Sequence, residues 1–247
     1  MSLSVVIITL NAIEHIRNCL ESVKWAEEII VLDSGSTDGT IDLCKEYTPH
    51  VYQTDWPGFG RQKNRAIGYA TQDWILVLDA DERLSEELQT EIRSVMSERG
   101  HVVAYRMKRL STFMDKLIRH GDWGKDWVIR LFQKDAGQYT ESLVHEHLLV
   151  KGAVGNLYAT LQHNTVTQLE TALHKLNVYS TLGAQQMQER GRRGGLARAC
   201  VSALWSFCRG YVVKFGFLDG QEGYLIALLT AQGSFYKYVK CNYFTKN

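Results

Sequence analysis

Apolar runs and helical segments alternate through the first 110 residues of this 247-residue chain. Three runs are almost wholly apolar, as strands buried on both faces are, and they span residues 3–9, 28–32 and 74–78. Between the first two, Ile13–Lys24 has apolar residues three and four positions apart, which is the spacing of a helix with one buried face. Strands that alternate with helices form a sheet covered on both faces. The pattern therefore predicts an α/β protein with an open, mostly parallel, doubly wound sheet.

The remainder of the chain sets the predicted domain boundaries. Residues 111–165 contain scattered glycines and aromatic residues and are predicted to form loops and short strands. A long helical segment follows at Leu169–Arg190, and Gly191–Gly195 (GRRGG) interrupts it. Two apolar and aromatic helical stretches follow. We predict one half of a domain at 1–110, a second half at 111–190 and a helical C-terminal appendage at 191–247.

Composition and termini exclude several protein classes. With 45% hydrophobic and 22% charged residues, the chain is not intrinsically disordered. Its start lacks the basic region and cleavage site of a signal peptide. The longest uncharged stretch late in the chain, 223–236, has 14 residues, and a membrane-spanning helix needs about 20. Five scattered cysteines without a CxxC pair favour a reducing compartment.

Acidic residues follow two of the predicted strands, at the sheet edge where open α/β folds bind ligands. Asp33 begins the loop DSGSTDG after the second strand, and its carboxylate could accept a hydrogen bond from a ring N–H or a ribose hydroxyl. The same loop equally suits a cap for the next helix. Asp79 and Asp81 follow the strand predicted at 74–78. Alternate residues of an extended segment point to one side, so this pair predicts a site for Mg²⁺ or Mn²⁺.

Other nucleotide-dependent and metal-dependent enzymes lack their motifs here. Leu10-Asn11-Ala12 follows the first strand, where a dinucleotide-binding fold would have GxGxxG. The chain has no GxxxxGK[ST] phosphate loop, and His145-Glu146-His147 lacks the two-residue gap of the HExxH metallopeptidase motif. A dehydrogenase, a P-loop nucleotidase and a peptidase are therefore excluded.

The motifs of residues 1–110, in this order and spacing, resemble the GT-A fold of family 2 glycosyltransferases. They are Thr9-Leu10-Asn11, Asp33-Ser-Gly-Ser-Thr-Asp38-Gly-Thr, Gly60-x-Gln62-x-Asn64 and Leu78-Asp79-Ala-Asp81-Glu82. Later segments are similar to a narrower branch, the bacterial lipopolysaccharide core β-1,4-glucosyltransferases that act on the inner-core heptose. These segments are Gly121-Asp-Trp123 to Arg130-Leu-Phe132, Val144-His-Glu146 and His163.

The resemblance implies roles for the matching residues in binding a nucleotide sugar. Asp33 would bind the base, usually uracil, and Asp38 would support its loop. Lys63 would help to hold the donor, and Asp79 would lie near the ribose or the metal. The implied nucleotide-sugar site comprises Thr9, Asn11, Asp33, Asp38, Lys63 and Asp79. Asp81 would ligate Mg²⁺ or Mn²⁺, with His163 as a further metal or diphosphate contact, although a buried histidine before a helix fits His163 equally well.

The implied reaction is a single inverting displacement, in which an acceptor hydroxyl attacks the anomeric carbon and the diphosphate leaves from the opposite face. It needs a carboxylate to take the acceptor proton and a cation on the leaving group. Glu146 is the candidate base, Asp122 and Asp126 compete with it, and a merely ion-paired Glu146 is the alternative. Asp122, Trp123, Asp126 and Arg130 are the expected acceptor-binding residues.

The resemblance further implies that a hexose, with glucose favoured, passes from a UDP-sugar to a hydroxyl of a lipopolysaccharide inner-core heptose or a similar glycolipid. UDP-galactose, UDP-N-acetylglucosamine and ADP-heptose fit the same motifs. A catalytically inactive GT-A binding module is the alternative to a metal-dependent hexosyltransferase.

Charge is distributed unevenly along the chain. From Met187 onward nine Lys/Arg face three Asp/Glu, a net +6, whereas residues 1–186 carry a net −5. Basic helices rich in aromatic residues suit a membrane surface with anionic lipid, and packing on the sheet domain or a dimer interface is the alternative. No nucleic-acid motif occurs, so nucleic acid is not an expected partner. We expect a cytoplasmic protein, peripheral on the inner face of the bacterial cytoplasmic membrane.

Overall fold

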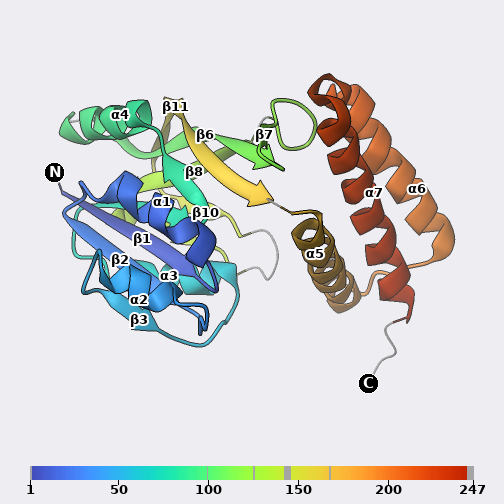
Figure 1. Cartoon of the computed structure of the whole chain (residues 1–247), viewed down its shortest axis with the longest axis horizontal. Coiled ribbons are helices and arrows are strands. Elements are labelled where there is room, and N and C mark those ends of the chain that lie inside the picture. Colours follow the sequence, from blue (N-terminus) through green and yellow to red (C-terminus); the bar gives the residue numbers. More distant parts are fainter. Residues whose placement is uncertain (1, 99, 125, 142–145, 167, 244–247) are drawn as a thin grey trace. The chain divides into compact units, whose positions relative to one another are not determined.

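The computed structural model describes residues 2–98, 100–124, 126–141, 146–166 and 168–243, and its elements are labelled in Figure 1. The chain forms two compact units. The sheet unit comprises Met1–Arg109 and Trp127–Asn164, and the helical unit comprises Leu110–Asp126 and Thr165–Asn247. These units do not follow the predicted boundaries, because residues 127–164 return to the sheet and the helix predicted to end at 190 belongs with the C-terminal helices.

The sheet has a parallel half and a half with antiparallel pairs. Strands β3, β2, β1 and β4 are parallel neighbours, which confirms the predicted parallel arrangement in this half. Beyond β4 the order continues as β8, β6, β11 and β5, where β4 pairs antiparallel with β8 and β11 pairs antiparallel with β5. The strands are β1 (Leu3–Thr9), β2 (Glu28–Asp33), β3 (Val51–Gln53), β4 (Trp74–Asp79), β5 (Glu82–Leu84), β6 (Val102–Phe113), β8 (Asp126–Gln133) and β11 (Ala153–Val166). Three short strands complete the set: β7 (Lys116–Leu117), which pairs with β6, and β9 (Gly137–Tyr139) with β10 (Leu148–Val150).

Strands β8 and β11 are long and lie where the sequence predicts only loops and short strands. In β11, Leu157 and Leu161 are buried whereas Asn156 and Tyr158 are exposed. One buried face gives an alternating pattern in place of an apolar run. Gly155 interrupts that pattern further, and it is required because a Cβ there would lie 2.7 Å from Cε1 of Tyr105. An analysis based on continuous apolar runs therefore misses this strand.

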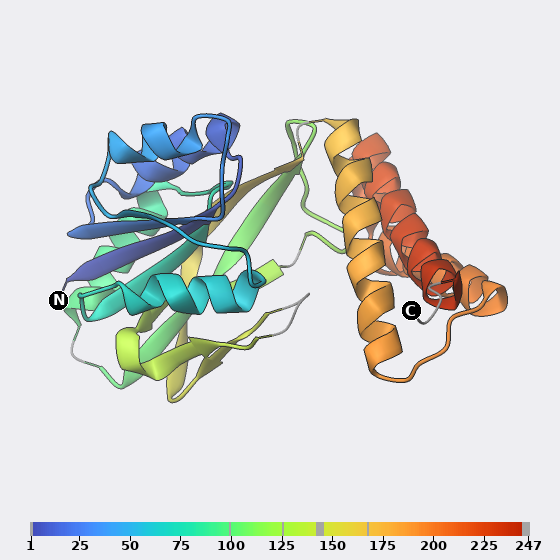
Figure 2. The same cartoon turned by 90° about the horizontal axis from the view of Figure 1, so that it is seen from below.

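Helices cover both faces of the sheet. Val5 and Ile7 of β1 belong to one apolar cluster with α1, α2 and α4, and the alternate residues Val6 and Ile8 belong to another with Ala66 of α3. Figure 2 shows α3 on the opposite face from α1 and α2. The helices are α1 (Ile13–Val23), α2 (Thr40–Lys45), α3 (Phe59–Gly68) and α4 (Glu86–Ser97), with a short 3₁₀ helix at Lys134–Ala136. Ser85 caps α4, and its Oγ accepts the N–H of Leu88 at 3.2 Å.

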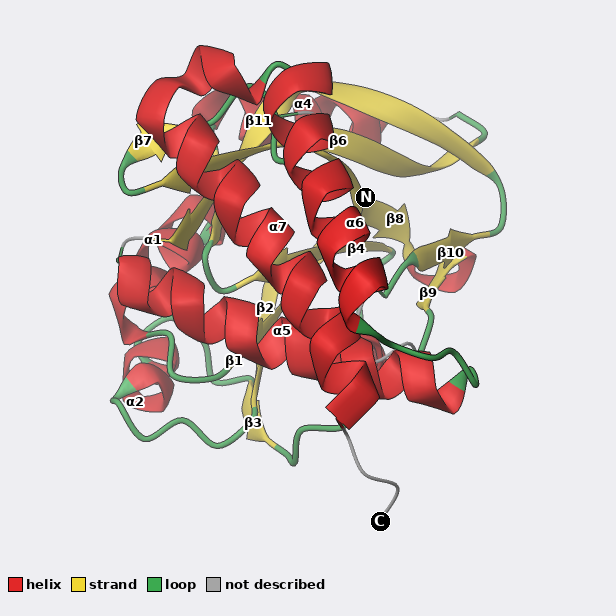
Figure 3. Ribbon diagram, turned by 90° about the vertical axis from the view of Figure 1, so that its right-hand side faces the viewer, coloured by secondary structure: helices red, strands yellow, loops and turns green. Residues whose placement is uncertain are grey.

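The helical unit consists of three long helices and the 110–126 excursion. Helix α7 packs against both α5 and α6, and Figure 3 shows α6 and α7 side by side. The predicted interruption at 191–195 is confirmed, since it separates the first two helices. The elements are α5 (Leu169–Glu189), α6 (Leu196–Cys208), a π-helical turn (Arg209–Val213), a 3₁₀ turn (Gly216–Asp219) and α7 (Gly220–Tyr243). Among the described residues, no helix has the length and apolar character that crossing a membrane requires.

Candidate active site

The carboxyl ends of β1, β2 and β4 meet at one edge of the sheet. The register of β1 pairs Thr9 with Asp33 of β2 and Ile8 with Asp79 of β4. The sequence predicted that polar residues after these strands share one edge, and the pairing confirms it. Most of the predicted donor-site residues therefore lie around a common centre.

A buried lysine links two carboxylates at this edge. Lys63 of α3 is 1% exposed, and its Nζ lies 2.9 Å from Oδ1 of Asp79 and 2.8 Å from Oε1 of Glu146. Burial alone would lower the pKa of Lys63, but the adjacent carboxylates raise it above its ordinary value. Lys63 is therefore a fixed cation, and Glu146 has the ion pair that the sequence analysis named as an alternative. A base role for Glu146 stays a prediction.

Arg130 of β8 forms a second bridge between carboxylates, joining Asp79 to Glu82. Its Nη2 lies 2.6 Å from Oδ2 of Asp79 and 2.6 Å from Oε1 of Glu82, which also contacts Arg109 at 3.1 Å. Burial would raise the pKa of Asp79, but Arg130 and Lys63 hold it well below its usual range. The prediction that Arg130 binds the acceptor does not fit this placement, because its guanidinium is buried between these carboxylates. Arg130 instead fixes Asp79.

The sequence of α3 explains how Lys63 reaches this centre. The Asn64 side chain pairs with the backbone of Tyr139, donating to its oxygen at 2.8 Å and accepting its N–H at 2.9 Å. A Cβ at Gly60 would lie 1.9 Å from the oxygen of Thr140. Only glycine allows so close an approach, so the spacing Gly60-x-x-Lys63-Asn64 docks α3 on the segment that leads to Glu146.

Asp81 and His163 come together as a candidate metal pair. The β5–β11 pairing aligns His163 with Glu82, and Nε2 of His163 lies 3.4 Å from Oδ2 of Asp81. In the parts of the chain that the structure describes, no three His, Cys, Asp or Glu side chains group as a complete metal site. Mg²⁺ usually keeps several waters and takes one or two protein ligands plus substrate phosphates. The pair fits such a shared site, whereas Asp79 is committed to two cations.

The loop after β2 is held by its own residues. Oδ1 of Asp33 accepts the N–H groups of Gly35 at 2.8 Å and Ser36 at 2.7 Å, and the Asp33 side chain is fully buried. This is the loop geometry that the sequence analysis gave as an alternative to ligand binding. Oδ1 of Asp38 accepts the N–H of Thr40 at 3.1 Å. A role for Asp33 in binding a base stays a prediction.

Asn11 and Asp38 join this loop to the one after β1. Asn11 adopts a left-handed backbone with φ 47°, and its Oδ1 accepts the N–H of Thr37 at 2.9 Å. Oδ2 of Asp38 accepts the N–H of Ile13 at 3.1 Å. Thr9, at the end of β1, has a buried hydroxyl with no hydrogen-bond partner among the described residues. The two loops form one hydrogen-bonded unit with an unsatisfied hydroxyl beside it.

The remaining predicted acceptor residues lie in the helical unit. Asp122 is paired with Arg209 at 3.0 Å and Lys214 at 2.7 Å. Trp123 packs edge-on against Phe113 with ring centroids 5.8 Å apart, and Asp126 begins β8. Asp122 is thus neutralised by two cations within its own unit. Residues 144 and 145, which belong to the motif around Glu146, lie outside the described residues.

Several residues of the centre were not predicted. Glu82 and Arg109 complete the charge network, and Nε2 of Gln62 donates to Ser34 at 3.0 Å and Thr54 at 2.9 Å. Glu82 adjoins Asp81 and Gln62 adjoins Lys63, so both stood inside recognised motifs. Arg109 carried no local signal, because only the pairing of distant strands brings it to Glu82.

Comparison with known proteins gives concordant results. Residues 4–145 match the model of glycosyl transferase family 2. The lipopolysaccharide core biosynthesis glycosyltransferase LpsC of Rhizobium meliloti is 30% identical over 246 residues, covering 94% of this chain and 91% of that protein. An uncharacterized glycosyltransferase of Rickettsia typhi is 27% identical over 250 residues, covering 96% and 86%. Among solved structures, a mannosyltransferase from Pyrobaculum calidifontis in complex with GDP-Man and Mn²⁺ has a TM-score of 0.55 at 13% identity and covers 99% of this chain and 88% of that one.

Proposed function

This chain belongs to glycosyltransferase family 2, and from that premise we propose that it transfers a hexose from a UDP-sugar to a hydroxyl of a lipopolysaccharide-core glycolipid. Glucose is the favoured sugar. The name of the Rhizobium meliloti relative supports the acceptor class. Because this acceptor is linked to lipid, the enzyme would act at the inner face of the cytoplasmic membrane. Within the chain, 1–110 would hold the donor, and parts of 111–190 would contact the acceptor.

The observation that carries the proposal is that two groups of charged and polar side chains lie at one edge of the sheet. Lys63 bridges Asp79 and Glu146, and Asp81 meets His163 directly after the same strand. The first group offers the fixed carboxylate of Glu146. The Asp81–His163 pair suits a cation that binds the diphosphate. An inverting displacement needs both functions in one place.

Each residue then has a defined task. The loop built on Asp33, Asn11 and Asp38 would hold the nucleotide, and the unpartnered Thr9 hydroxyl would bond to it. Asp81 and His163 would hold Mg²⁺ or Mn²⁺, which when bound neutralises charge on the leaving diphosphate.

Glu146 would take the proton of the acceptor hydroxyl. Lys63 holds this carboxylate through Oε1. Lys63 therefore acts as a positioning residue, because its own ammonium group is buried between two carboxylates and is not offered to the donor. Arg130 performs the same task for Asp79.

Nucleotide binding is the first test of this proposal. Thermal melting should shift upward with UDP plus Mn²⁺, by an amount that corresponds to about 2.7 kcal/mol at a hundredfold excess over the dissociation constant. ADP and GDP, each with and without metal, are the controls. A shift with ADP alone would replace the donor with one such as ADP-heptose. No shift with any nucleotide would favour an inactive binding module.

Turnover is the second test. With UDP-glucose and a lipopolysaccharide-core acceptor, Glu146→Gln should lower kcat by about 10²–10⁴-fold, which is the contribution of a general base. Glu141→Gln is the matched control, since Glu141 is paired with Arg61 at 2.8 Å in an exposed contact on the same segment. Equal activity of Glu146→Gln and the wild type would remove Glu146 from the mechanism.

A further inference from the structure

The buried residues of helix α6 are small, whereas several of its large apolar residues are exposed. Ala199 and Ser206 are buried, and Oγ of Ser202 lies 2.6 Å from Oγ of Ser234 in α7. On the open side, Val201 is 70%, Leu204 67% and Trp205 60% exposed. A surface helix of a water-soluble domain has the opposite arrangement. A helix that lies in a membrane interface, by contrast, turns its apolar face outward to the lipid.

The turn after α6 extends the same apolar surface. Its exposed apolar residues are Val212, Val213, Phe215, Phe217 and Leu218, and Lys214 among them is paired with Asp122. Phe215 has φ 59°, in the left-handed region that a bulky residue rarely adopts. The backbone here therefore accepts strain that a glycine would avoid, and its result is an exposed aromatic side chain. We call α6 and this turn together the apolar face.

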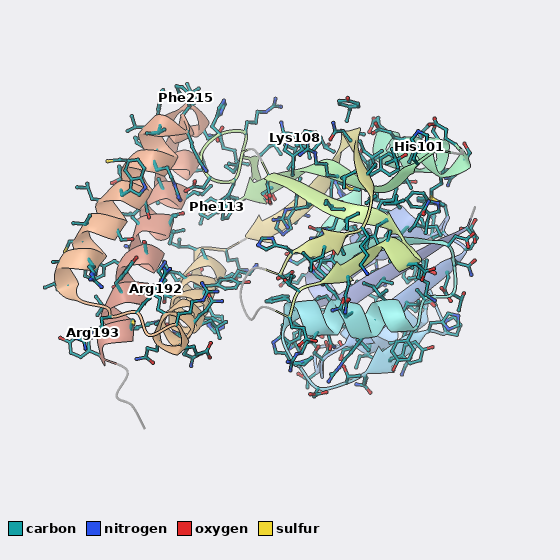
Figure 4. The ribbon with its side chains drawn as sticks, turned by 180° about the vertical axis from the view of Figure 1, so that it is seen from behind. His101, Lys108, Phe113, Arg192, Arg193 and Phe215 are labelled. Carbon is teal, nitrogen blue, oxygen red and sulfur yellow. The ribbon has the colours of Figure 1, made fainter. Side chains whose placement is uncertain are left out.

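Exposed arginines stand beside the apolar face. Arg190, Arg192, Arg193 and Arg198 are exposed, and within the described ranges none of them has an acidic partner. Figure 4 labels Arg192 and Arg193 at one end of the helical unit and Phe215 at the other. Glu189 is the acidic residue nearest to these arginines in sequence, and it is exposed, so four arginines face one carboxylate here. The positive charge of this region is therefore open to an external anion.

We propose that the apolar face lies in the headgroup region of an anionic bilayer, with the four arginines on its lipid phosphates. A helix with an apolar side and exposed basic residues is the type that lies in a membrane interface, and the described helices are not of the type that spans one. A second copy fits less well, because a two-fold interface sets the same patch against itself, and in this patch the exposed arginines outnumber the acidic residues that could pair with them. The inference deepens the proposed function by naming the element that brings the enzyme to its acceptor.

Co-sedimentation with vesicles tests the inference without nucleotide or acceptor, so it can fail separately from the transfer reaction. The wild type should bind vesicles of equal parts phosphatidylcholine and phosphatidylglycerol and bind pure phosphatidylcholine far less. The triple variant Val201→Gln, Leu204→Gln, Trp205→Gln should bind at least about tenfold more weakly, because three apolar side chains no longer enter the bilayer. Leu149→Gln with Tyr158→Gln, which changes exposed apolar residues of the sheet unit, should bind like the wild type.

The charges are tested by a second variant. Replacing Arg190, Arg192 and Arg193 with Gln should weaken binding about a hundredfold at low salt, since each cation near an anionic surface contributes about fivefold. The loss should shrink as salt screens the charges. Lys45→Gln with Lys151→Gln is the control for exposed cations elsewhere.

A quenching measurement locates the helix in the unaltered protein. Brominated lipid should quench part of the tryptophan fluorescence, and Trp205→Phe should abolish that part while vesicle binding persists. Three results would overturn the inference: no binding of the wild type to anionic vesicles, equal binding by the triple variant, or a wild-type dimer that the triple variant converts to a monomer. The last result would assign the apolar face to a second copy.

Discussion

The sheet unit and α6 follow opposite packing rules. In the sheet unit the residues with the largest buried side chains include Trp74, Phe132 and Leu76, and the sheet faces are closed by helices. In α6 the buried positions are Ala199 and Ser206, while Leu204 and Trp205 face outward. Water favours the burial of apolar side chains, so the sheet unit has the packing expected of a domain surrounded by water. The outward apolar side chains of α6 fit a less polar environment, such as the bilayer proposed above.

Charges show the same reversal. Lys63 and Arg130 are buried between carboxylates in the sheet unit, whereas Arg192 and Arg193 are exposed. A buried, paired cation is fixed in place and orients its partners. An exposed cation acts over a distance of about a Debye length, roughly 8–10 Å, and is weakened by salt. One set of cations is thus suited to positioning a reaction and the other to finding a surface.

The largest expected effect separates the two functions. Asp81→Ala should lower transfer about a thousandfold, because several kcal/mol of charge stabilisation on the leaving group would be lost. Its melting temperature and vesicle binding should match the wild type. The triple α6 variant should show the converse, with normal transfer to a detergent-solubilised acceptor. A variant that loses both transfer activity and vesicle binding would contradict the separation of the two functions.

The buried lysine gives the next effect. Lys63→Met should lower the free energy of unfolding by about 3–5 kcal/mol, the cost of leaving buried charges without their partner. Lys116→Met is the counterpart in the helical unit, where the Lys116–Glu222 pair is partly exposed, and it should change little because water screens that pair. Urea denaturation of both variants measures the contrast. A larger loss in Lys116→Met would contradict it.

Leucine truncations compare the two packing rules directly. Leu76→Ala in β4 should cost about 2–5 kcal/mol, because Leu76 is fully buried and a cavity would remain. Leu204→Ala should change stability by less than about 0.5 kcal/mol, as exposed substitutions do. Chemical denaturation of the two variants provides the measurement. A destabilisation of Leu204→Ala as large as that of Leu76→Ala would show that α6 is buried in solution.

Acid sensitivity gives the smallest contrast. The folded-state pKa of Asp79 is well below its ordinary value, which is about 3.9 in an unfolded chain. The stability that ionised Asp79 supplies is therefore complete above that value and is lost as pH falls toward the folded-state pKa. Thermal melts should show a shallower acid loss in Asp79→Asn than in the wild type. Asp42→Asn, at an exposed site 3.8 Å from Lys45, should retain the wild-type slope.

Local patterns predicted the parallel half of the fold well. Strands β1, β2 and β4 are buried on both faces, so their apolar runs were visible in the sequence. Strands β8 and β11 were missed, because a strand with one buried face carries a weaker pattern and Gly155 serves a packing contact. Boundaries between the units were also missed, since residues 127–164 join the sheet through pairing with distant strands.

The candidate site was predictable to the extent that it follows strand ends. Asp79, Asp81 and His163 were named in advance, and β5–β11 pairing brings the last two together. The role of Lys63 was not, because burial between Asp79 and Glu146 depends on how α3 docks. Arg130 was placed wrongly for the same reason: its motif says nothing of the neighbour that β8 acquires in the sheet.

The position of β5 has a consequence for how the enzyme is made. Strand β5 follows Asp81 directly, yet its neighbour in the sheet is β11, which is the last strand of the sheet unit in chain order. Translation proceeds at about 5–20 residues per second, so Asp81 and β5 leave the ribosome several seconds before their partner strand exists. A nascent chain can therefore fold β1 to β4 early, while the pair of Asp81 and His163 closes only when the sheet is complete. Premature termination anywhere before β11 would therefore leave Asp81 without His163, and the proposed metal pair could not form.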